Sequence, residues 1–272
     1  TSFWNMTDHK EQKDFLWLNL KGLPYFRALL RAVEAAYYQD LPLTSPMLDL
    51  GCGDGDFATN TFDRKIDVGM DPWLQELKQA SDTDAYRLLL QGDGCNMPFP
   101  DDSFNTIISN SVLEHIPRVD DVISEVSRVL KPGASFIFCV PNQNFTHNLS
   151  ISRFLERLGL KKLAAAYRGW FNKISRHHHC DSQAIWKERL ETNQIAIDLA
   201  WDYFSPRALG VLEWGHYFGL PAWILKKLTG RWILAPSRWN LNWLLGLLRP
   251  YSLEPCSQPE GSYTFYIAHK AE

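Results

Sequence analysis

Hydrophobic positions follow two different periods along the first half of the chain. Short apolar runs, typical of strands buried on both faces of a sheet, lie at residues 47–50, 66–71, 86–90 and 135–140, with a further run beginning at residue 104. Residues 117–130 carry valine and isoleucine at helical spacing, which predicts an amphipathic helix. Strands that alternate with helices predict a parallel sheet covered on both faces, so the expected fold class is α/β.

The pattern changes after residue 141. The elements predicted there are a helical stretch over 151–174, a helix that begins at Asp181 or Ser182 and ends near 190, and strands at 194–203 and 263–269. Before the first strand, Pro24 opens a helix that continues to residue 38. The chain therefore divides into an N-terminal helical lead-in at 1–44, a sheet core at 45–141, a helical cap at 142–180, a core helix and sixth strand at 181–204, an insertion at 205–258 and a last core strand at 259–272.

The most informative segment for function is 47–57. Its apolar strand carries Asp49 and runs into a loop with glycines at positions 51, 53 and 55. Glycine permits a positive φ and lets a ligand approach the backbone closely. The N–H groups at the start of a helix attract anionic groups. We therefore expect a small-molecule site at the carboxyl end of the first strand.

The spacing of these glycines separates the candidate ligands. A dinucleotide fingerprint needs its third glycine at position 56, where this chain has Asp56, and no lysine of a P-loop follows. The order Asp49-x-Gly51-x-Gly53-x-Gly55 resembles motif I of the class I S-adenosylmethionine-dependent methyltransferases. That resemblance implies a seven-stranded Rossmann-like sheet whose last two strands form an antiparallel edge, here with helical cap insertions.

Three further segments resemble the same family and follow in the expected order. Asp71 ends the second apolar run, at about the distance from the glycine loop at which an acid reaches ribose hydroxyls. Residues 91–99 resemble the family's Asp-Ala-x-x-Leu-Pro-Phe segment, with Gly94 in place of the alanine. Residues 104–115, which end in a Glu-His turn, and the turn at 131–133 resemble the type 11 branch, related to quinone and sterol C-methyltransferases.

The resemblance also implies which residues bind S-adenosylmethionine, or S-adenosylhomocysteine as the product. The expected contacts of the methionine moiety are Asp49, Gly51, Cys52, Gly53, Gly55 and, through its backbone, Asn110. The expected contacts of the ribose and the adenine are Asp71, Pro72, Asp93 and Gly94. Trp73 stands where many relatives have a small residue, so it either covers the adenine or packs on the first helix of the core.

Methyl transfer from a sulfonium chiefly requires that the acceptor be aligned with the methyl group. A base is needed only where the acceptor must lose a proton, and His115 is the first candidate because its ordinary pKa suits neutral pH. The alternative for His115 is a structural role in bracing its turn. Weaker candidates on the side of the helical cap are His177, His178, His179 and Tyr203. Consecutive histidines have diverging side chains, so no metal site is expected in the run.

Residues 205–250 combine tryptophan, leucine and basic side chains. They contain five of the 11 tryptophans in the chain: Trp214, Trp223, Trp232, Trp239 and Trp243. Their lysines and arginines greatly outnumber the acidic residues, of which there is one, Glu213. Such a composition suits a membrane interface or the wall of an apolar substrate site. The alternative is that the tryptophans fill the core of a helical insertion.

Composition excludes several classes of protein. The 272 residues, 45% of them hydrophobic, suit one α/β domain with insertions, and the net charge of −3 argues against general nucleic-acid binding. Five cysteines without a paired framework indicate a reducing, cytoplasmic setting. Peripheral contact with the inner face of a membrane is expected only through 205–250.

The predicted function is methyl transfer from S-adenosylmethionine to a small, apolar or lipid-linked acceptor. Two alternatives stay open on the sequence: a non-catalytic cofactor-binding or membrane-associated protein on the same fold, and a nicotinamide-dependent oxidoreductase. The residues leave open which acceptor is used, which of its atoms is methylated, and the oligomeric state.

Overall fold

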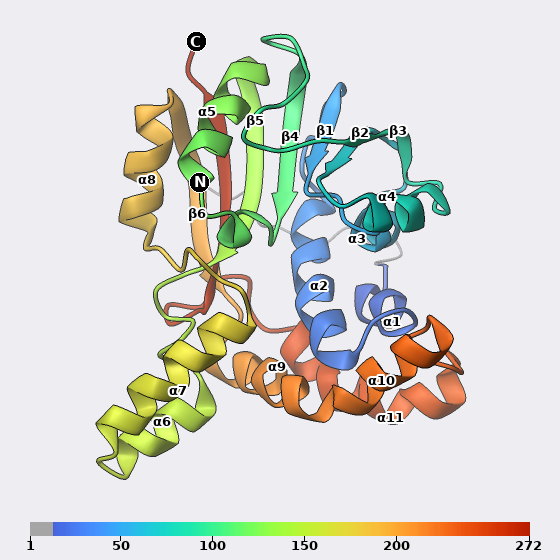
Figure 1. Ribbon diagram of the computed structural model, residues 1–272, viewed down its shortest axis with the longest axis vertical. Coiled ribbons are helices and arrows are strands. Elements are labelled where there is room, and N and C mark those ends of the chain that lie inside the picture. The colour runs from blue at the N-terminus through green and yellow to red at the C-terminus, as the bar shows by residue number, and fades with distance from the viewer. Residues whose placement is uncertain (1–12) are drawn as a thin grey trace.

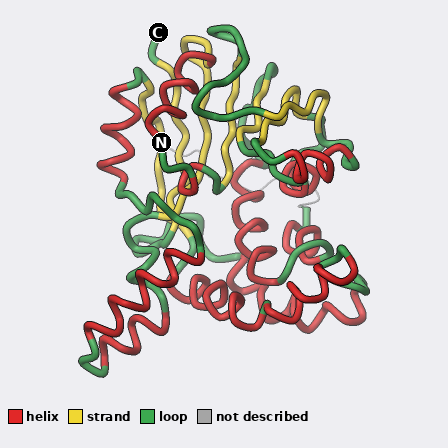
Figure 2. The backbone as a smooth tube through the Cα atoms, viewed as in Figure 1, coloured by secondary structure: helices red, strands yellow, loops and turns green. Residues whose placement is uncertain are grey.

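The computed structural model describes residues 13–272, so the first part of the predicted lead-in lies outside the described residues. The fold contains a seven-stranded sheet in the order β3-β2-β1-β4-β5-β7-β6 (Figures 1 and 2). Its strands are β1 (Met47–Leu50), β2 (Ile66–Asp71), β3 (Tyr86–Gln91), β4 (Phe104–Asn110), β5 (Leu130–Pro141), β6 (Ile195–Tyr203) and β7 (Tyr263–Lys270). β1 to β5 pair in parallel, whereas β7 is antiparallel to both of its neighbours. The α/β class and the antiparallel edge predicted from the sequence are confirmed.

Two apolar cores lie on opposite faces of this sheet, because neighbouring side chains on a strand point in opposite directions. Met47, Ile108 and Ile137 join one core, and their chain neighbours Leu48 and Ile107 join the other. The second core is completed by α5 (Val119–Val129) and α8 (Gln183–Thr192), the latter capped by the Ser182 hydroxyl as predicted. The first core is covered by α2 (Tyr25–Tyr38), α3 (Asp56–Thr61) and α4 (Leu74–Ser81).

A layer of helices lies below the sheet, beyond the carboxyl ends of the parallel strands (Figure 1). It consists of α1 (Phe15–Leu20), α9 (Pro206–Phe218), α10 (Leu220–Thr229) and α11 (Arg238–Ser252). The insertion between β6 and β7 thus packs on the N-terminal helices, and Arg249 of α11 is 2.7 Å from the carboxylate of Asp14. Among the described residues, no helix is both long and apolar enough to cross a bilayer.

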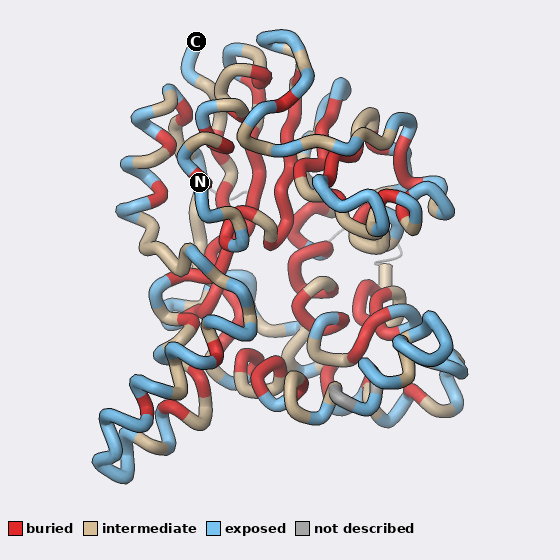
Figure 3. Tube along the Cα trace, viewed as in Figure 1, coloured by how far each residue is buried: buried red, intermediate tan, exposed pale blue. Residues whose placement is uncertain are grey.

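The stretch predicted to be helical over 151–174 consists of two helices. α6 (Ser150–Arg157) and α7 (Lys161–Ile174) form a hairpin that extends away from the sheet (Figure 1). Gly159 lies between them with a φ of +75°, a left-handed conformation that glycine adopts without steric cost and that ends a helix. The helical character of the stretch is confirmed, and its division at Gly159 was not predicted. The surface of the hairpin is largely exposed (Figure 3).

Candidate active site

The glycine loop joins β1 to α3 through three left-handed residues. The φ angles of Gly51, Gly53 and Gly55 are +80°, +55° and +79°. A Cβ atom on Gly51 would lie 2.4 Å from the Val112 side chain, so only glycine fits between the loop and the end of β4. Gly55 is the residue before the first turn of α3. The loop brings bare backbone to the carboxyl edge of the sheet, where ligands of open α/β sheets bind.

A cavity of about 360 Å³ opens beside this loop. Of the predicted cofactor residues it is lined by Asp49, Gly51, Cys52, Gly53 and Asn110. Trp73, which is 71% exposed, lies at the cavity as well, and its contact with the adenine stays a prediction. The volume lies in the range of small-ligand pockets, and the glycine loop lets a ligand approach the backbone closely.

Asp71 holds the loop from the end of β2. One carboxylate oxygen accepts a hydrogen bond from the N–H of Gly53 at 3.0 Å, and the other accepts one from the N–H of Trp73 at 2.9 Å. Five of the predicted cofactor residues are not among those that line the cavity beside the loop: Gly55, Asp71, Pro72, Asp93 and Gly94. The contacts expected of these five residues with the cofactor stay predictions.

Asp49 lies below the loop and is nearly inaccessible to solvent. Its carboxylate accepts a hydrogen bond from the hydroxyl of Tyr86 at 2.7 Å. Burial raises the pKa of Asp49 to about 7; the neighbouring Asp71 also raises it, whereas the Tyr86 bond and the charge of Arg31 lower it. The site therefore contains a carboxyl group that changes charge near neutral pH.

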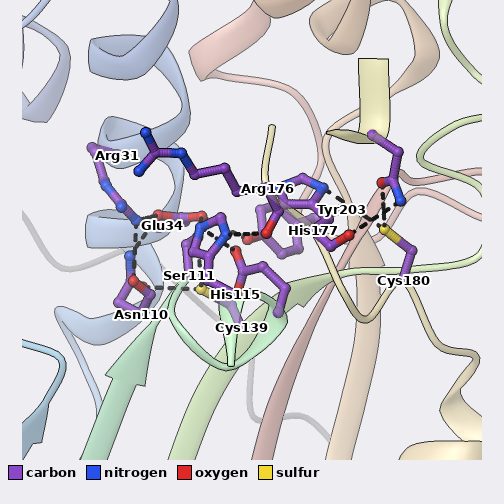
Figure 4. A network of polar contacts seen from close by, with 12 residues as sticks. Arg31, Glu34, Asn110, Ser111, His115, Cys139, Arg176, His177, Cys180 and Tyr203 are labelled. Atoms are coloured by element: carbon purple, nitrogen blue, oxygen red, sulfur yellow. Dashed lines mark hydrogen bonds and ion pairs between the residues drawn. The ribbon is translucent and has the colours of Figure 1, made fainter. Parts of the chain in front are cut away.

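A buried network that the sequence did not predict centres on Glu34 of α2 (Figure 4). The Glu34 carboxylate accepts hydrogen bonds from Arg31 at 2.8 Å, Asn110 at 2.6 Å, Ser111 at 2.9 Å and Tyr203 at 3.0 Å. Glu34 lies among alanines and arginines on a helix of ordinary composition, so no local signal marked it. The network fixes the end of β4 and the guanidinium of Arg31 beside the cavity.

A second cavity, of about 400 Å³, adjoins the first. Its apolar wall is formed by Phe26, Leu30, Phe145, Ile174, Leu212 and Tyr263. Arg27, Arg31, Ser111 and His115 line both cavities, so the two spaces meet at these side chains. The rest of the lining of the second cavity is polar or charged and includes Arg176, His177 and His216. Two connected chambers, one beside a backbone loop and one with an apolar side and a polar side, can hold a donor and an acceptor next to each other.

The histidines proposed as bases from the sequence differ in whether they line the chambers. His115 lies where the chambers meet, with Nδ1 3.0 Å from the Arg176 carbonyl oxygen, and burial lowers its pKa. Of the histidine run, only His177 lines the second chamber. His178 is exposed, and its backbone N–H donates to the Glu114 carbonyl at 2.7 Å. The N–H of His179 faces the same carbonyl at 3.3 Å, so the loop after α7 is tied to the Glu-His turn.

Tyr203 is not among the residues that line either chamber. It is fully buried at the end of β6, where its hydroxyl donates to Glu34 and its ring packs against Tyr37 and Tyr263. The structure therefore places Tyr203 in the network below the site.

Comparison with known proteins agrees with this geometry. Residues 48–138 match the model of a methyltransferase domain. The chain is 32% identical over 202 residues to an uncharacterized methyltransferase of Mycobacterium tuberculosis, an alignment that covers 72% of this chain and 74% of the relative. It is also 33% identical over 116 residues to the botryococcene C-methyltransferase of Botryococcus braunii, covering 40% of this chain and 31% of that enzyme.

Solved structures show the same fold at low sequence identity. An S-adenosylmethionine-dependent methyltransferase from Thermotoga maritima superposes with a TM-score of 0.52 and 15% identity, covering 93% of this chain and 92% of the other. One from Mesorhizobium loti gives a TM-score of 0.50 and 16% identity, covering 92% and 100%. The strand order, the glycine loop with its cavity, and these relatives together show that the chain belongs to the class I S-adenosylmethionine-dependent methyltransferases.

Proposed function

We propose that this methyltransferase acts on a small, apolar or lipid-linked acceptor that binds in the second chamber. The observation that carries the proposal is the apolar side of that chamber, where Phe26, Phe145 and Leu212 line the space that meets the cofactor cavity at His115. Apolar surface binds apolar ligands because both are removed from water. A relative whose name states a C-methyltransferase of botryococcene supports the same chemistry.

The reaction depends on how the chain aligns its two ligands. When bound, S-adenosylmethionine supplies a methyl group on a positively charged sulfur, and Asp49 with the backbone of Gly51 to Gly53 would hold its methionine end. The walls of the second chamber would orient the acceptor toward the junction, which lowers the barrier mainly through proximity. With Nδ1 held by the Arg176 carbonyl, the neutral ring of His115 presents Nε2 as an acceptor for a proton.

Exposed tryptophans on the insertion support contact with a membrane surface. Trp239 and Trp243 of α11 are 81% and 70% exposed, whereas Leu241, Leu245 and Leu248 of the same helix are buried. Leucines therefore fill the interior of the insertion, and these two tryptophans do not. Indole rings at a surface suit the headgroup region of a bilayer.

Basic residues lie beside several of the aromatic rings. Lys227 stacks over Trp223 and Lys226 over Trp232, each at 4.7 Å, and Arg238 lies 4.8 Å from the ring of Trp17 in α1. Cations interleaved with aromatic rings suit anionic lipid, which is enriched on the cytoplasmic leaflet. We infer that the insertion rests on that leaflet, next to the source of a lipid-linked acceptor.

The acceptor chamber is tested by filling it. Leu212→Trp adds volume to the wall of the second chamber, whereas Leu247→Trp makes the same change at an exposed position of α11. With radiolabelled S-adenosylmethionine and a fractionated lipid extract, we expect Leu212→Trp to lose about tenfold or more of the transfer into apolar products. Both variants should bind S-adenosylhomocysteine with unchanged affinity by calorimetry. Transfer only into polar small molecules, or unimpaired transfer by Leu212→Trp, would contradict the proposal.

A further inference from the structure

One oxygen of a buried carboxyl group at the second chamber lacks a hydrogen-bond partner. Glu114, in the turn after β4 (Leu113–His115), is 1% exposed and lines the chamber. No described residue forms a hydrogen bond with its Oε2 atom. A buried carboxyl oxygen without a partner is costly, and either a proton on the carboxyl group or a bound cation relieves that cost.

Two histidines face the same carboxyl group. The ligand atoms of Glu114, His115 and His177 all lie within 4.8 Å of one another, and Glu114 Oε1 is 3.7 Å from His115 Nε2. In a tetrahedral zinc site with bonds of about 2.1 Å, neighbouring ligand atoms are separated by roughly 3.4 Å. The three side chains therefore need only small movements to share one ion.

Contacts of one ring nitrogen of each histidine determine which nitrogen is left to bind a metal ion. The Arg176 carbonyl oxygen, 3.0 Å from Nδ1 of His115, can accept the proton of that nitrogen and leaves Nε2 as the ligand atom (Figure 4). Histidines that bind metals commonly donate their other N–H to a carbonyl in this way. His177 has Nδ1 3.7 Å from the sulfur of Cys180, and its ring centroid is 5.2 Å from that of His115.

Three arginines line the chamber beside this cluster: Arg27, Arg31 and Arg176. The charge of Arg31 is offset by Glu34 at 2.8 Å, whereas a bound cation would have to be held against the charges of the other two. The run of histidines is held to the turn because the Glu114 carbonyl accepts the N–H of His178 at 2.7 Å. The cap loop and the core turn are therefore fixed against each other at the cluster.

We propose that Glu114, His115 and His177 bind one divalent transition-metal ion, of the zinc type, in the wall of the acceptor chamber. Two imidazoles and one carboxylate are a ligand set for such ions, and the remaining coordination positions face the chamber. This revises the expectation of no metal: the run of three histidines supplies only His177, and the other two ligands come from a distant turn. With an ion bound, His115 is a ligand and no longer a base.

The ion would recognise an oxygen group on the acceptor. An open coordination position orients a hydroxyl or carbonyl oxygen and makes a hydroxyl more acidic. The acceptor would then have an apolar body and one oxygen-bearing end near the methyl donor, an extension that rests on the proposed function. The metal site itself does not depend on that function.

The test uses Co²⁺ alone as the probe on the full chain after treatment with a chelator. We expect saturable binding by calorimetry, with the visible absorption of cobalt bound to imidazole. His177→Ala and Glu114→Gln should each weaken binding by about tenfold or more, with unchanged circular dichroism. His178→Ala is the matched control, since it removes an exposed histidine next in the chain, and should bind as the unaltered chain does.

The outcomes separate the metal site from the proposed function. Absence of saturable binding, or equal loss in His177→Ala and His178→Ala, would overturn the metal site whatever acceptor is used. Cobalt binding together with no transfer to apolar acceptors would instead refute the proposed function and leave the site in place. Should Glu114→Gln fail to fold, His177→Ala decides the result, because His177 is in the cap loop and outside the core.

Discussion

At the scale of single residues, the conformation of the cofactor loop depends on glycines, which have no Cβ atom. Gly51 and Gly53 both have a positive φ, but only Gly51 is also crowded, with Val112 where its Cβ would be. An alanine at position 53 meets nothing within 4 Å. The two positions therefore separate backbone strain from a steric clash.

We expect Gly51→Ala to lower stability and cofactor affinity more than Gly53→Ala. Both variants bear the cost of a left-handed alanine, of about 1 kcal/mol, and Gly51→Ala adds an overpacking cost of about 1–3 kcal/mol. Urea unfolding and calorimetry with S-adenosylhomocysteine measure both quantities. Equal effects of the two substitutions would show that Val112 yields and that the fit of the loop to β4 is unimportant.

Asp49 makes stability depend on pH. Its pKa in the folded chain is raised to about 7 from 3.8, so the stability it provides is complete below about pH 4 and is lost as pH rises to about 7. Asp49→Asn removes this loss. The free energy of unfolding of Asp49→Asn, relative to the unaltered chain, should therefore rise between pH 5 and pH 8 by on the order of 2 kcal/mol.

Asp67 of β2 provides a control of opposite sign. Burial would raise its pKa, but hydrogen bonds from Ser45 and from the Met47 N–H, with the charge of Arg87, outweigh burial and lower it. Stability from Asp67 is therefore present above its unfolded pKa and lost as pH falls. Thermal melts of Asp49→Asn and Asp67→Asn across the pH range check the signs, and parallel profiles would refute the assignment for Asp49.

At the scale of elements, α2 connects parts of the chain that are distant in sequence. Glu34 joins this helix to the end of β4 through Asn110 and to the end of β6 through Tyr203. The helix also packs against α9 and α11 of the insertion. The network thus fixes the floor of the active site to the helical layer below it.

Removing the centre of this network should be costly. Glu34→Ala leaves the largely buried guanidinium of Arg31 without its carboxylate partner. Removing one partner of a buried ion pair lowers the free energy of unfolding by about 3–5 kcal/mol. Glu34→Gln keeps the shape and part of the hydrogen bonding, so its cost should be smaller. Urea unfolding gives both values. A loss below about 1 kcal/mol for Glu34→Ala would mean that the network is dispensable.

At the scale of the whole molecule, the helices of the insertion, which carry the exposed Trp239 and Trp243, lie at the end of the protein beyond the carboxyl ends of the parallel strands (Figure 1). The chambers lie between the sheet and this helical layer, since α2 and α9 both supply lining residues. An acceptor that leaves a membrane under the insertion would therefore have a short path to the second chamber. This arrangement joins the two parts of the proposed function.

We expect the chain to bind vesicles of phosphatidylcholine with phosphatidylserine more tightly than phosphatidylcholine alone. The pair Trp239→Ala with Trp243→Ala should weaken that binding by about tenfold or more, because two exposed indoles lose their contact with the bilayer. The control pair is Leu88→Ala with Leu199→Ala, at exposed positions of β3 and β6. Sedimentation with vesicles measures binding, and equal retention by both pairs would exclude the insertion as the contact surface.

The sequence by itself determined the alternating strands and helices of the core and the glycine loop, and its resemblance to a known family added the antiparallel edge and the cofactor class. The strands, helices and loop depend on local signals: strand and helix periods, and glycines that allow left-handed backbone. The helix turn at Gly159 was missed because the apolar spacing continues through it. A period in the sequence does not report the φ of a single residue.

Only the tertiary structure decided which side chains meet in the site. Glu34 and Tyr203 lie 169 positions apart, and the cluster of Glu114, His115 and His177 joins a core turn to a cap loop. Such contacts arise when distant segments are packed at one edge of the sheet, and no local pattern marks them in advance. The tertiary structure also decided whether the tryptophans of the insertion are buried or exposed. The sequence was compatible with both, because burial depends on how the helices pack and not on the residue type alone.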